Sequence, residues 1–122
     1  MEPLTLNPPF PGTRSGFFQV TFLVAARPGT DHGQLYTHWL DVHAPNVAAV
    51  MARVGGFGYI VNHSRHREAE PWAGMAELYF PDEAGWAEFR ATIRPDGMER
   101  WIDASATVVL RSSTEMIGIA PA

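Results

Sequence analysis

The sequence predicts an α+β domain in which helices pack on one face of a four-stranded antiparallel sheet. Four segments rich in β-branched and aromatic residues and two helical segments follow one another in the order β-α-β-β-α-β. The chain has 122 residues, of which 46% are hydrophobic, as expected for one globular domain with one core. This order of elements is typical of the ferredoxin-like arrangement, whose helices lie together on one side of the sheet.

Each of the four expected strands is an apolar or alternating segment bounded by turn residues. In the first, Phe18, Val20 and Phe22 fall on one face and a mixture of polar and apolar residues on the other. Both faces are therefore expected to be covered, the second by the sheet of another subunit. The expected strands are Phe17–Ala26, Phe57–Ser64, Trp72–Phe80 and Thr107–Ile119.

The first helical region is expected to begin near residue 32, because Asp31 and Gln34 resemble a capping box. Pro45 lacks a backbone N–H and disfavours helical backbone at the residue before it, so the helix is expected to kink or end at His43-Ala44. Pro45 would then open a second helical piece, since proline is favoured in a first turn.

The remaining segments complete the predicted domain. A helix is expected from Pro81 or Asp82 onward, and a short helix over Met98–Ala104 follows a break at Pro95-Asp96-Gly97. Residues 1–16 are rich in Pro, Gly, Ser, Thr and Asn, and they are expected to form an extended arm ahead of a domain over residues 17–122.

Composition argues against several classes of function. The net charge is −4 and no dense Lys/Arg cluster occurs, so nucleic-acid binding is not expected. No apolar run approaches the ~20 residues of a membrane span, and no secretory signal is evident, so a cytoplasmic location is expected. Cysteine is absent, which excludes a thiol nucleophile, disulfides and thiolate metal ligands.

His43 is the best candidate for chemistry, because it lies at the expected helix break. The field at a helix C-terminus favours its charged form and burial opposes it, which suits a general acid or base. Alternatively, His43 donates to a freed carbonyl and fixes the kink. His38 lies five residues earlier, about 140° around a regular helix, so the two histidines are not expected to share a metal. A structural role is expected for His38, which nevertheless stands among the candidate substrate contacts.

Three polar residues of the strands are further catalytic candidates: Asn62, His63 and Glu77. Asn62 and His63 are adjacent in one strand, so only one of them can face the helices. Glu77 lies between apolar neighbours, where a carboxylate needs a partner. These groups could polarise a substrate carbonyl or orient His43; otherwise they make inter-strand bonds, subunit contacts or a salt bridge.

Aromatic residues are abundant enough to line a pocket between helices and sheet, although most must belong to the core. Such walls suit a hydrophobic or aromatic ligand. No dinucleotide loop, phosphate-binding loop, nucleophile turn or paired metal-ligand spacing occurs, so no metal or cofactor is expected. The candidate substrate-binding residues are Phe22, Tyr36, His38, Trp39, Tyr59, Trp72 and Trp86.

Several of these motifs resemble the EthD-domain family. The similar pieces are Arg27-Pro28-Gly29, His38-Trp39 with His43-Ala44-Pro45, Gly56-Phe57 with Tyr59 to His63, and Ala76 to Phe80. The resemblance extends over residues 17–119, and it implies a dimeric α+β barrel with a cofactor-free pocket in each subunit. It also implies that the second histidine of the motif, here His43, is catalytic. Gly33 departs from the family pattern and should weaken the first helical turn by up to about 1 kcal/mol.

These observations predict an enzyme that uses His43 for proton transfer on a small aromatic or polyketide-like substrate. Cyclisation, dehydration, isomerisation and decarboxylation all need such a step. Relatives of the resembled family include muconolactone isomerase-like enzymes and polyketide decarboxylases and cyclases. Two alternatives stay open: a cofactorless oxygenase of electron-rich aromatics, and a dimeric ligand-binding protein without catalysis.

Overall fold

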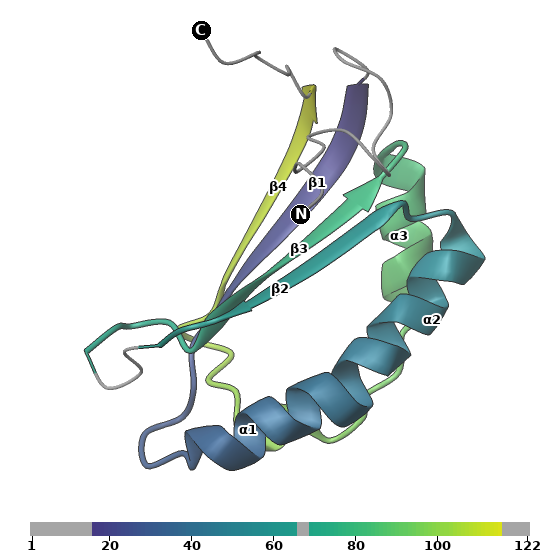
Figure 1. The fold of residues 1–122 in the computed structure, drawn as a ribbon. Helices are drawn as coiled ribbons and strands as arrows, with labels where there is room; N and C mark the ends of the chain where they lie inside the picture. Colours follow the sequence, from purple (N-terminus) through teal and green to yellow (C-terminus); the bar gives the residue numbers. More distant parts are fainter. Residues whose placement is uncertain (1–15, 66–68, 116–122) are drawn as a thin grey trace, which may run out of the picture.

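The computed structural model describes residues 16–65 and 69–115 of the chain. In this part, a four-stranded antiparallel sheet has the strand order β2-β3-β1-β4. The helices lie together on one face of this sheet (Figure 1). The strands are β1 (Gly16–Val24), β2 (Gly58–His63), β3 (Gly74–Phe80) and β4 (Val108–Glu115).

The helical elements follow the predicted order along the chain. They are α1 (His32–His38), η1 (Trp39–His43, a π-helical turn), α2 (Ala44–Val54), α3 (Glu83–Thr92) and η2 (Met98–Arg100, a 3₁₀ turn). The predicted α+β, ferredoxin-like fold class is therefore confirmed. None of the helices within residues 16–65 and 69–115 is both long enough and apolar enough to span a bilayer.

The core lies between the sheet and the helices, as the strand pattern predicts. Phe18, Val20 and Val24 of β1 are buried on the helical side, and β1 occupies the middle of the sheet between β3 and β4. Trp39 of η1 and Phe80 of β3 are the largest fully buried side chains. Burying a large apolar side chain contributes roughly 1.5–3 kcal/mol, so these residues anchor the helical layer to the sheet.

The helix ends follow from their capping residues. Asp31 accepts a hydrogen bond from the Gln34 backbone N–H at 3.1 Å, and Asp82 accepts one from the Gly85 N–H at 3.2 Å. Each satisfies an amide that the first turn leaves unpaired. Gly55 ends α2 with φ of 79°, a backbone conformation that glycine adopts without steric cost.

The first helical region does not end before Pro45, which was one of the two expected outcomes, although η1 gives way to α2 between His43 and Ala44. The chain stays helical through His43 and Ala44, and η1 accommodates the approach to Pro45. In η1 the Ala44 N–H donates to the Trp39 carbonyl five residues earlier. A π-turn of this kind inserts one extra residue into the helix, so α2 continues directly from it with Pro45 in its first turn.

Other element boundaries also differ from the expectation. The helix predicted over Met98–Ala104 is only the three-residue turn η2, and the first strand ends at Val24. Beyond β1, Ala26 makes an isolated bridge to Ile102, which ties the start of the helical region to the segment before β4. The predicted arm lies, apart from Gly16, outside the described residues, as does the end of the predicted last strand.

Candidate functional site

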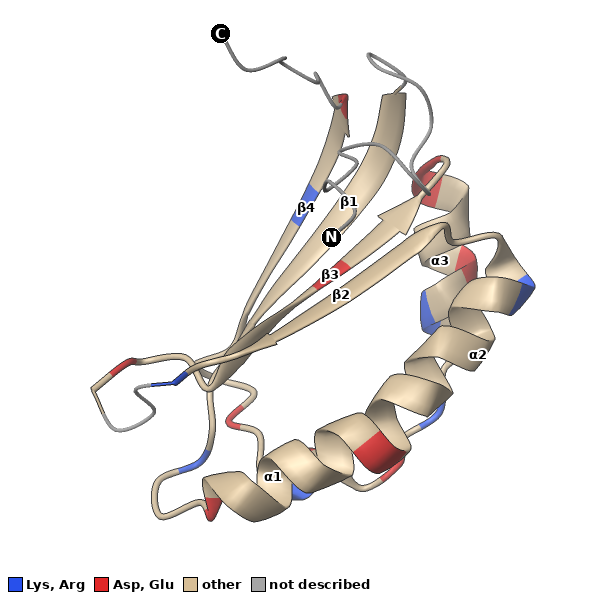
Figure 2. Ribbon diagram, viewed as in Figure 1, with Lys and Arg blue, Asp and Glu red and all other residues tan. Residues whose placement is uncertain are grey.

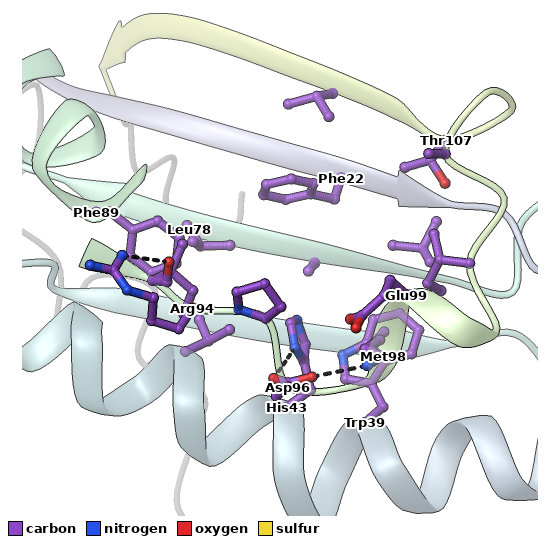
Figure 3. Close-up of a pocket in the computed structure, with 18 of the residues that line it drawn as sticks. Phe22, Trp39, His43, Leu78, Phe89, Arg94, Asp96, Met98, Glu99 and Thr107 are labelled. Atoms are coloured by element: carbon purple, nitrogen blue, oxygen red, sulfur yellow. Dashed lines mark hydrogen bonds and ion pairs between the residues drawn. The ribbon is translucent and has the colours of Figure 1, made fainter. Parts of the chain in front are cut away.

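A pocket of about 710 Å³ lies between the helices and the inner face of the sheet. Its walls are mainly apolar and include Phe22 of β1, Val47 of α2, Leu78 of β3 and Phe89 of α3. Much of the remaining wall comes from residues 93–107, the segment that connects α3 to β4 (Figure 3). The predicted hollow between helices and sheet is thus present.

His43 lines this pocket and is held by a carboxylate. Its Nδ1 lies 2.7 Å from Oδ2 of Asp96, and the exposed fractions of the two side chains are 29% and 11%. An ionised carboxylate can only accept, so Nδ1 carries the hydrogen in this bond. The Nε2 atom of a neutral His43 ring is then left with a free lone pair.

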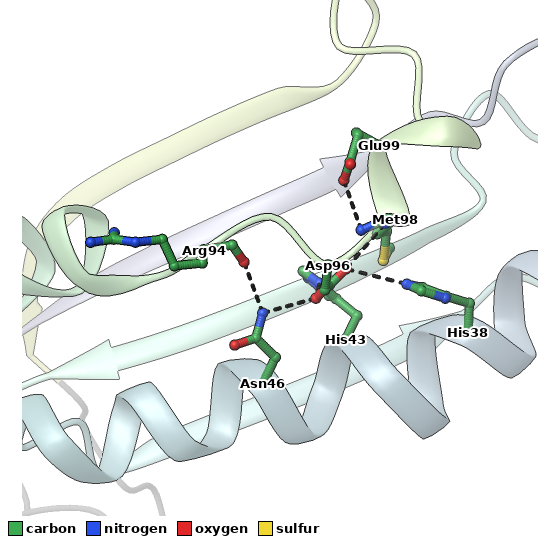
Figure 4. A network of polar contacts seen from close by, with 8 residues as sticks. His38, His43, Asn46, Arg94, Asp96, Met98 and Glu99 are labelled. Carbon is green, nitrogen blue, oxygen red and sulfur yellow. Dashed lines mark hydrogen bonds and ion pairs between the residues drawn. The ribbon is translucent and has the colours of Figure 1, made fainter.

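Asp96 is the centre of a polar network (Figure 4). Besides His43, it accepts hydrogen bonds from Asn46 Nδ2 at 2.9 Å, from the Met98 N–H at 3.1 Å, and from His38 Nε2 at 3.2 Å. Burial alone would raise the pKa of Asp96, but the hydrogen bonds from Asn46, the histidines and Met98 outweigh it. The pKa therefore lies well below its ordinary value, and the carboxylate stays charged at neutral pH.

The π-turn explains how two histidines five residues apart reach the same carboxylate. In a regular α-helix, His38 and His43 would point about 140° apart. In η1 the backbone bonds run from residue i to i+5, so residues five apart come close to one side of the helix. The expectation that the two histidines lie apart is therefore wrong, although they meet at Asp96 rather than at a metal.

The candidate substrate contacts divide into two groups. Phe22, Trp39 and Tyr59 line the pocket. Tyr36 is buried outside the pocket lining, where its hydroxyl donates to the Ala73 carbonyl at 2.6 Å. Trp86 packs in the core against Phe89 with the ring centroids 5.8 Å apart.

His38 and Trp72 also lie outside the pocket lining. His38 contacts the Trp101 ring at 4.9 Å between centroids and borders a second, shallower hollow at the surface. Trp72 is half-buried just before β3 and is absent from the pocket wall.

None of the three catalytic candidates on the strands lines the pocket that contains His43. His63 faces the helices, as alternation allows, and it stacks on Tyr36 with the ring centroids 4.0 Å apart. Asn62 is exposed on the opposite face of the sheet. Glu77 also lies on that opposite face, where its carboxylate accepts a hydrogen bond from the Tyr79 hydroxyl. The sheet itself therefore separates Asn62 and Glu77 from the pocket.

Asp96 and Asn46 are the site residues that sequence reasoning missed. Pro95-Asp96-Gly97 was readable as a turn, and Asp96 does accept from the backbone N–H two residues on, as an aspartate in such a turn does. Nothing in the local pattern connects that turn to His43, which lies 53 residues away in sequence. Within the part of the chain that the structure describes, no cluster of three or more potential ligands could hold a metal ion.

Comparisons with known proteins identify a family, and they include solved structures that resemble this chain. The crystal structure of PA3566 from Pseudomonas aeruginosa resembles the chain with a TM-score of 0.45 and 15% sequence identity, over 88% of this chain and 100% of that one. No curated protein matches the sequence significantly. The family model of the EthD domain matches residues 27–105, which is more than half of the chain and includes both His43 and Asp96. The chain therefore belongs to the EthD domain family.

Proposed function

We propose that the protein is a cofactor-free enzyme in which His43 moves a proton on a small hydrophobic, aromatic or polyketide-like substrate. The observation that carries this proposal is the His43–Asp96 pair at the wall of an apolar pocket. Nδ1 is engaged by the carboxylate, so Nε2 is the atom that takes the substrate proton. The Asp96 carboxylate then stabilises the imidazolium that forms.

The surroundings suit such a base. The pocket is large enough for a bicyclic aromatic molecule, since ligand sites typically measure about 300–1,000 Å³. Its apolar walls remove water from the reacting atoms, which strengthens the interaction between the charged pair and the substrate. Asn46 and the Met98 N–H hold Asp96 in place, so the base is oriented before the substrate binds.

The test measures proton transfer directly and does not require the natural substrate. The α-hydrogens of 2-tetralone, a pocket-sized ketone, are followed by NMR as they exchange with deuterium from D₂O. We expect the wild-type protein to accelerate this exchange and His43→Gln to lose about 10²- to 10⁴-fold of the acceleration, the usual contribution of a general base. Asp96→Asn should lose at least about 10-fold, because Asn offers Nδ1 no charge and can reverse the tautomer.

His32→Gln is the matched control. His32 lies at the start of α1, its ring 6.0 Å from Tyr36, and it does not line the pocket. Its substitution should leave exchange unchanged. Wild-type exchange rates in His43→Gln would exclude His43 as the base. Oxygen uptake during turnover of an electron-rich phenol would instead assign a cofactorless oxygenase, and binding of 2-tetralone without accelerated exchange would favour a non-catalytic ligand-binding protein.

A further inference from the structure

Two residues that line the pocket each carry a buried polar atom that makes no hydrogen bond of regular geometry. Within residues 16–65 and 69–115, neither Nε1 of Trp39 nor the hydroxyl oxygen of Tyr59 has a hydrogen-bond partner. Trp39 comes from η1 and Tyr59 from β2, and both residues line the pocket that also contains His43 (Figure 3 labels Trp39 and His43). Buried polar atoms in native proteins nearly always have hydrogen-bond partners. Two such atoms without a regular partner, both on pocket-lining residues, therefore suggest that a ligand supplies the missing hydrogen-bond acceptor.

Both groups are available as donors at neutral pH. Burial raises the pKa of Tyr59 to about 12, the nearby Trp39 indole opposes part of this rise, and the charge on Asp96 adds to it. The phenol therefore keeps its hydrogen. The indole N–H can only donate. The Trp39 indole lowers the Tyr59 pKa as a hydrogen-bond donor toward the phenol oxygen, although the two groups form no hydrogen bond of regular geometry.

We propose that Trp39 and Tyr59 form a subsite for the carbonyl oxygen of an apolar ketone-like substrate, an assignment that rests on the proposed function and deepens it. The ligand must be apolar because Phe22, Val47 and Leu78 form the facing walls. It must carry an acceptor oxygen because two donors are otherwise unsatisfied. A neutral carbonyl fits better than a carboxylate, since the Asp96 charge acts on the same place and repels an anion.

The subsite complements the base. Removing a proton beside a carbonyl shifts electron density onto the carbonyl oxygen, and donors aimed at that oxygen stabilise the enolate that forms. His43 would take the proton on Nε2 while Trp39 and Tyr59 bind the developing oxyanion. Reprotonation by the same imidazolium at another atom returns the base to its neutral form.

The test compares two probes of the same shape. Acetophenone carries a carbonyl oxygen where α-methylstyrene carries a methylene group. The difference between their affinities therefore measures the hydrogen bonds that the protein donates to this oxygen. Binding is followed by NMR with ¹⁵N-labelled protein. We expect the wild type to bind acetophenone about 5- to 10-fold more tightly, the contribution of one or two hydrogen bonds. The Trp39 indole N–H resonance should move downfield with the ketone alone.

Tyr59→Phe removes one oxygen and leaves the aromatic ring that packs on the core. It should reduce the preference for the ketone to about 2-fold or less, because only the indole donor remains. Its melting temperature should equal or exceed that of the wild type, since the substitution removes a buried hydroxyl without a partner. Trp39 is not substituted and is followed only through its indole N–H resonance. The residue is 1% exposed, and removing its side chain would disrupt folding.

Three results would overturn the subsite: equal affinities of the wild type for the two probes, no binding of either probe up to its solubility limit, or an unchanged preference in Tyr59→Phe. His43→Gln separates this outcome from the proposed function. It should keep the ketone preference while losing proton exchange. A ketone preference without His43-dependent exchange would leave the subsite standing and reject the acid–base role.

Discussion

At the scale of single residues, Asp96 is the side chain on which the site depends. Four donors from three parts of the chain converge on it: two histidines on either side of the π-turn, Asn46 of α2, and the Met98 backbone. Asn46 also donates to the Arg94 carbonyl at 3.0 Å, so the same amide ties α2 to the segment that carries Asp96. The network therefore positions the His43 ring and also fastens the pocket wall to the helix.

Asp96→Asn should destabilise the fold in a pH-dependent way. The folded-state pKa of Asp96 is lowered, so its contribution is present above the ordinary aspartate value of 3.8 and is lost as the pH falls below it. We expect a loss of about 2 kcal/mol in the free energy of unfolding at pH 7, typical of removing charged hydrogen bonds from a half-buried group. Urea denaturation at pH 7 and pH 3 measures this, and the difference between variant and wild type should shrink at pH 3.

Asp41→Asn is the control for that measurement. Asp41 is exposed in η1 and does not line the main pocket. Its substitution should change stability by less than about 0.5 kcal/mol at both pH values. An Asp96→Asn difference that is the same at pH 3 as at pH 7 would contradict the assignment of a lowered pKa.

At the scale of elements, the sequence predicted the order and type of the strands and helices but not how the first helix passes Pro45. Alternation in Phe18 and Val20 identified the inner face of β1, and Asp31 and Asp82 marked helix starts, because these signals depend on near neighbours. The π-turn is different. Its extra residue is stabilised by packing of Trp39 in the core and by the bonds of His38 and His43 to a distant carboxylate.

Gly74 at the start of β3 is where the strands and η1 meet most closely. A Cβ built on Gly74 would overlap the Asn62 carbonyl oxygen of β2 and lie 2.9 Å from the Trp39 ring. Gly74→Ala must therefore displace backbone or the most buried tryptophan, and we expect it to cost about 1–3 kcal/mol. Thermal unfolding monitored by circular dichroism measures the loss.

Gly16→Ala provides the comparison within the same sheet. Its nearest neighbour would be the Thr114 carbonyl oxygen at 3.9 Å, which is an ordinary contact. The melting temperature of this variant should stay within a few degrees of the wild-type value, as about 0.5 kcal/mol implies. If Gly74→Ala were equally mild, Trp39 would be less tightly held than the structure indicates.

At the scale of the whole molecule, the outer face of the sheet is not covered by any described helix (Figure 1). One row across this face, from β2 to β4, contains Ile60, Glu77, Thr21 and Leu110. Ile60 and Leu110 are 40% and 54% exposed. In Figure 2 the charged residues lie mainly on helices and loops, and the sheet carries few of them. We propose that a second copy of the chain packs on this face, as the family resemblance implies.

Leu110→Lys should convert such a dimer into a monomer. It places a charge within the proposed interface, and this charge would have to lose its hydration on association. Size-exclusion chromatography with light scattering should give about half the wild-type mass for the variant. Leu40→Lys is the matched control, because Leu40 is 55% exposed on η1, on the helical layer, and its substitution should leave the mass unchanged. A wild-type protein that is monomeric at micromolar concentration would contradict the proposal.

If His43 is the base proposed above, the position of Asp96 has a consequence for the order of substrate entry and proton transfer. The carboxylate belongs to the stretch of chain that walls the pocket, while the imidazole belongs to the helix opposite. An outward movement of this segment that admitted a substrate would also move the Asp96 carboxylate away from the His43 ring. On the proposed function, substrate entry and proton transfer are then separate steps, because His43 has its carboxylate partner only when this segment lies against the helix.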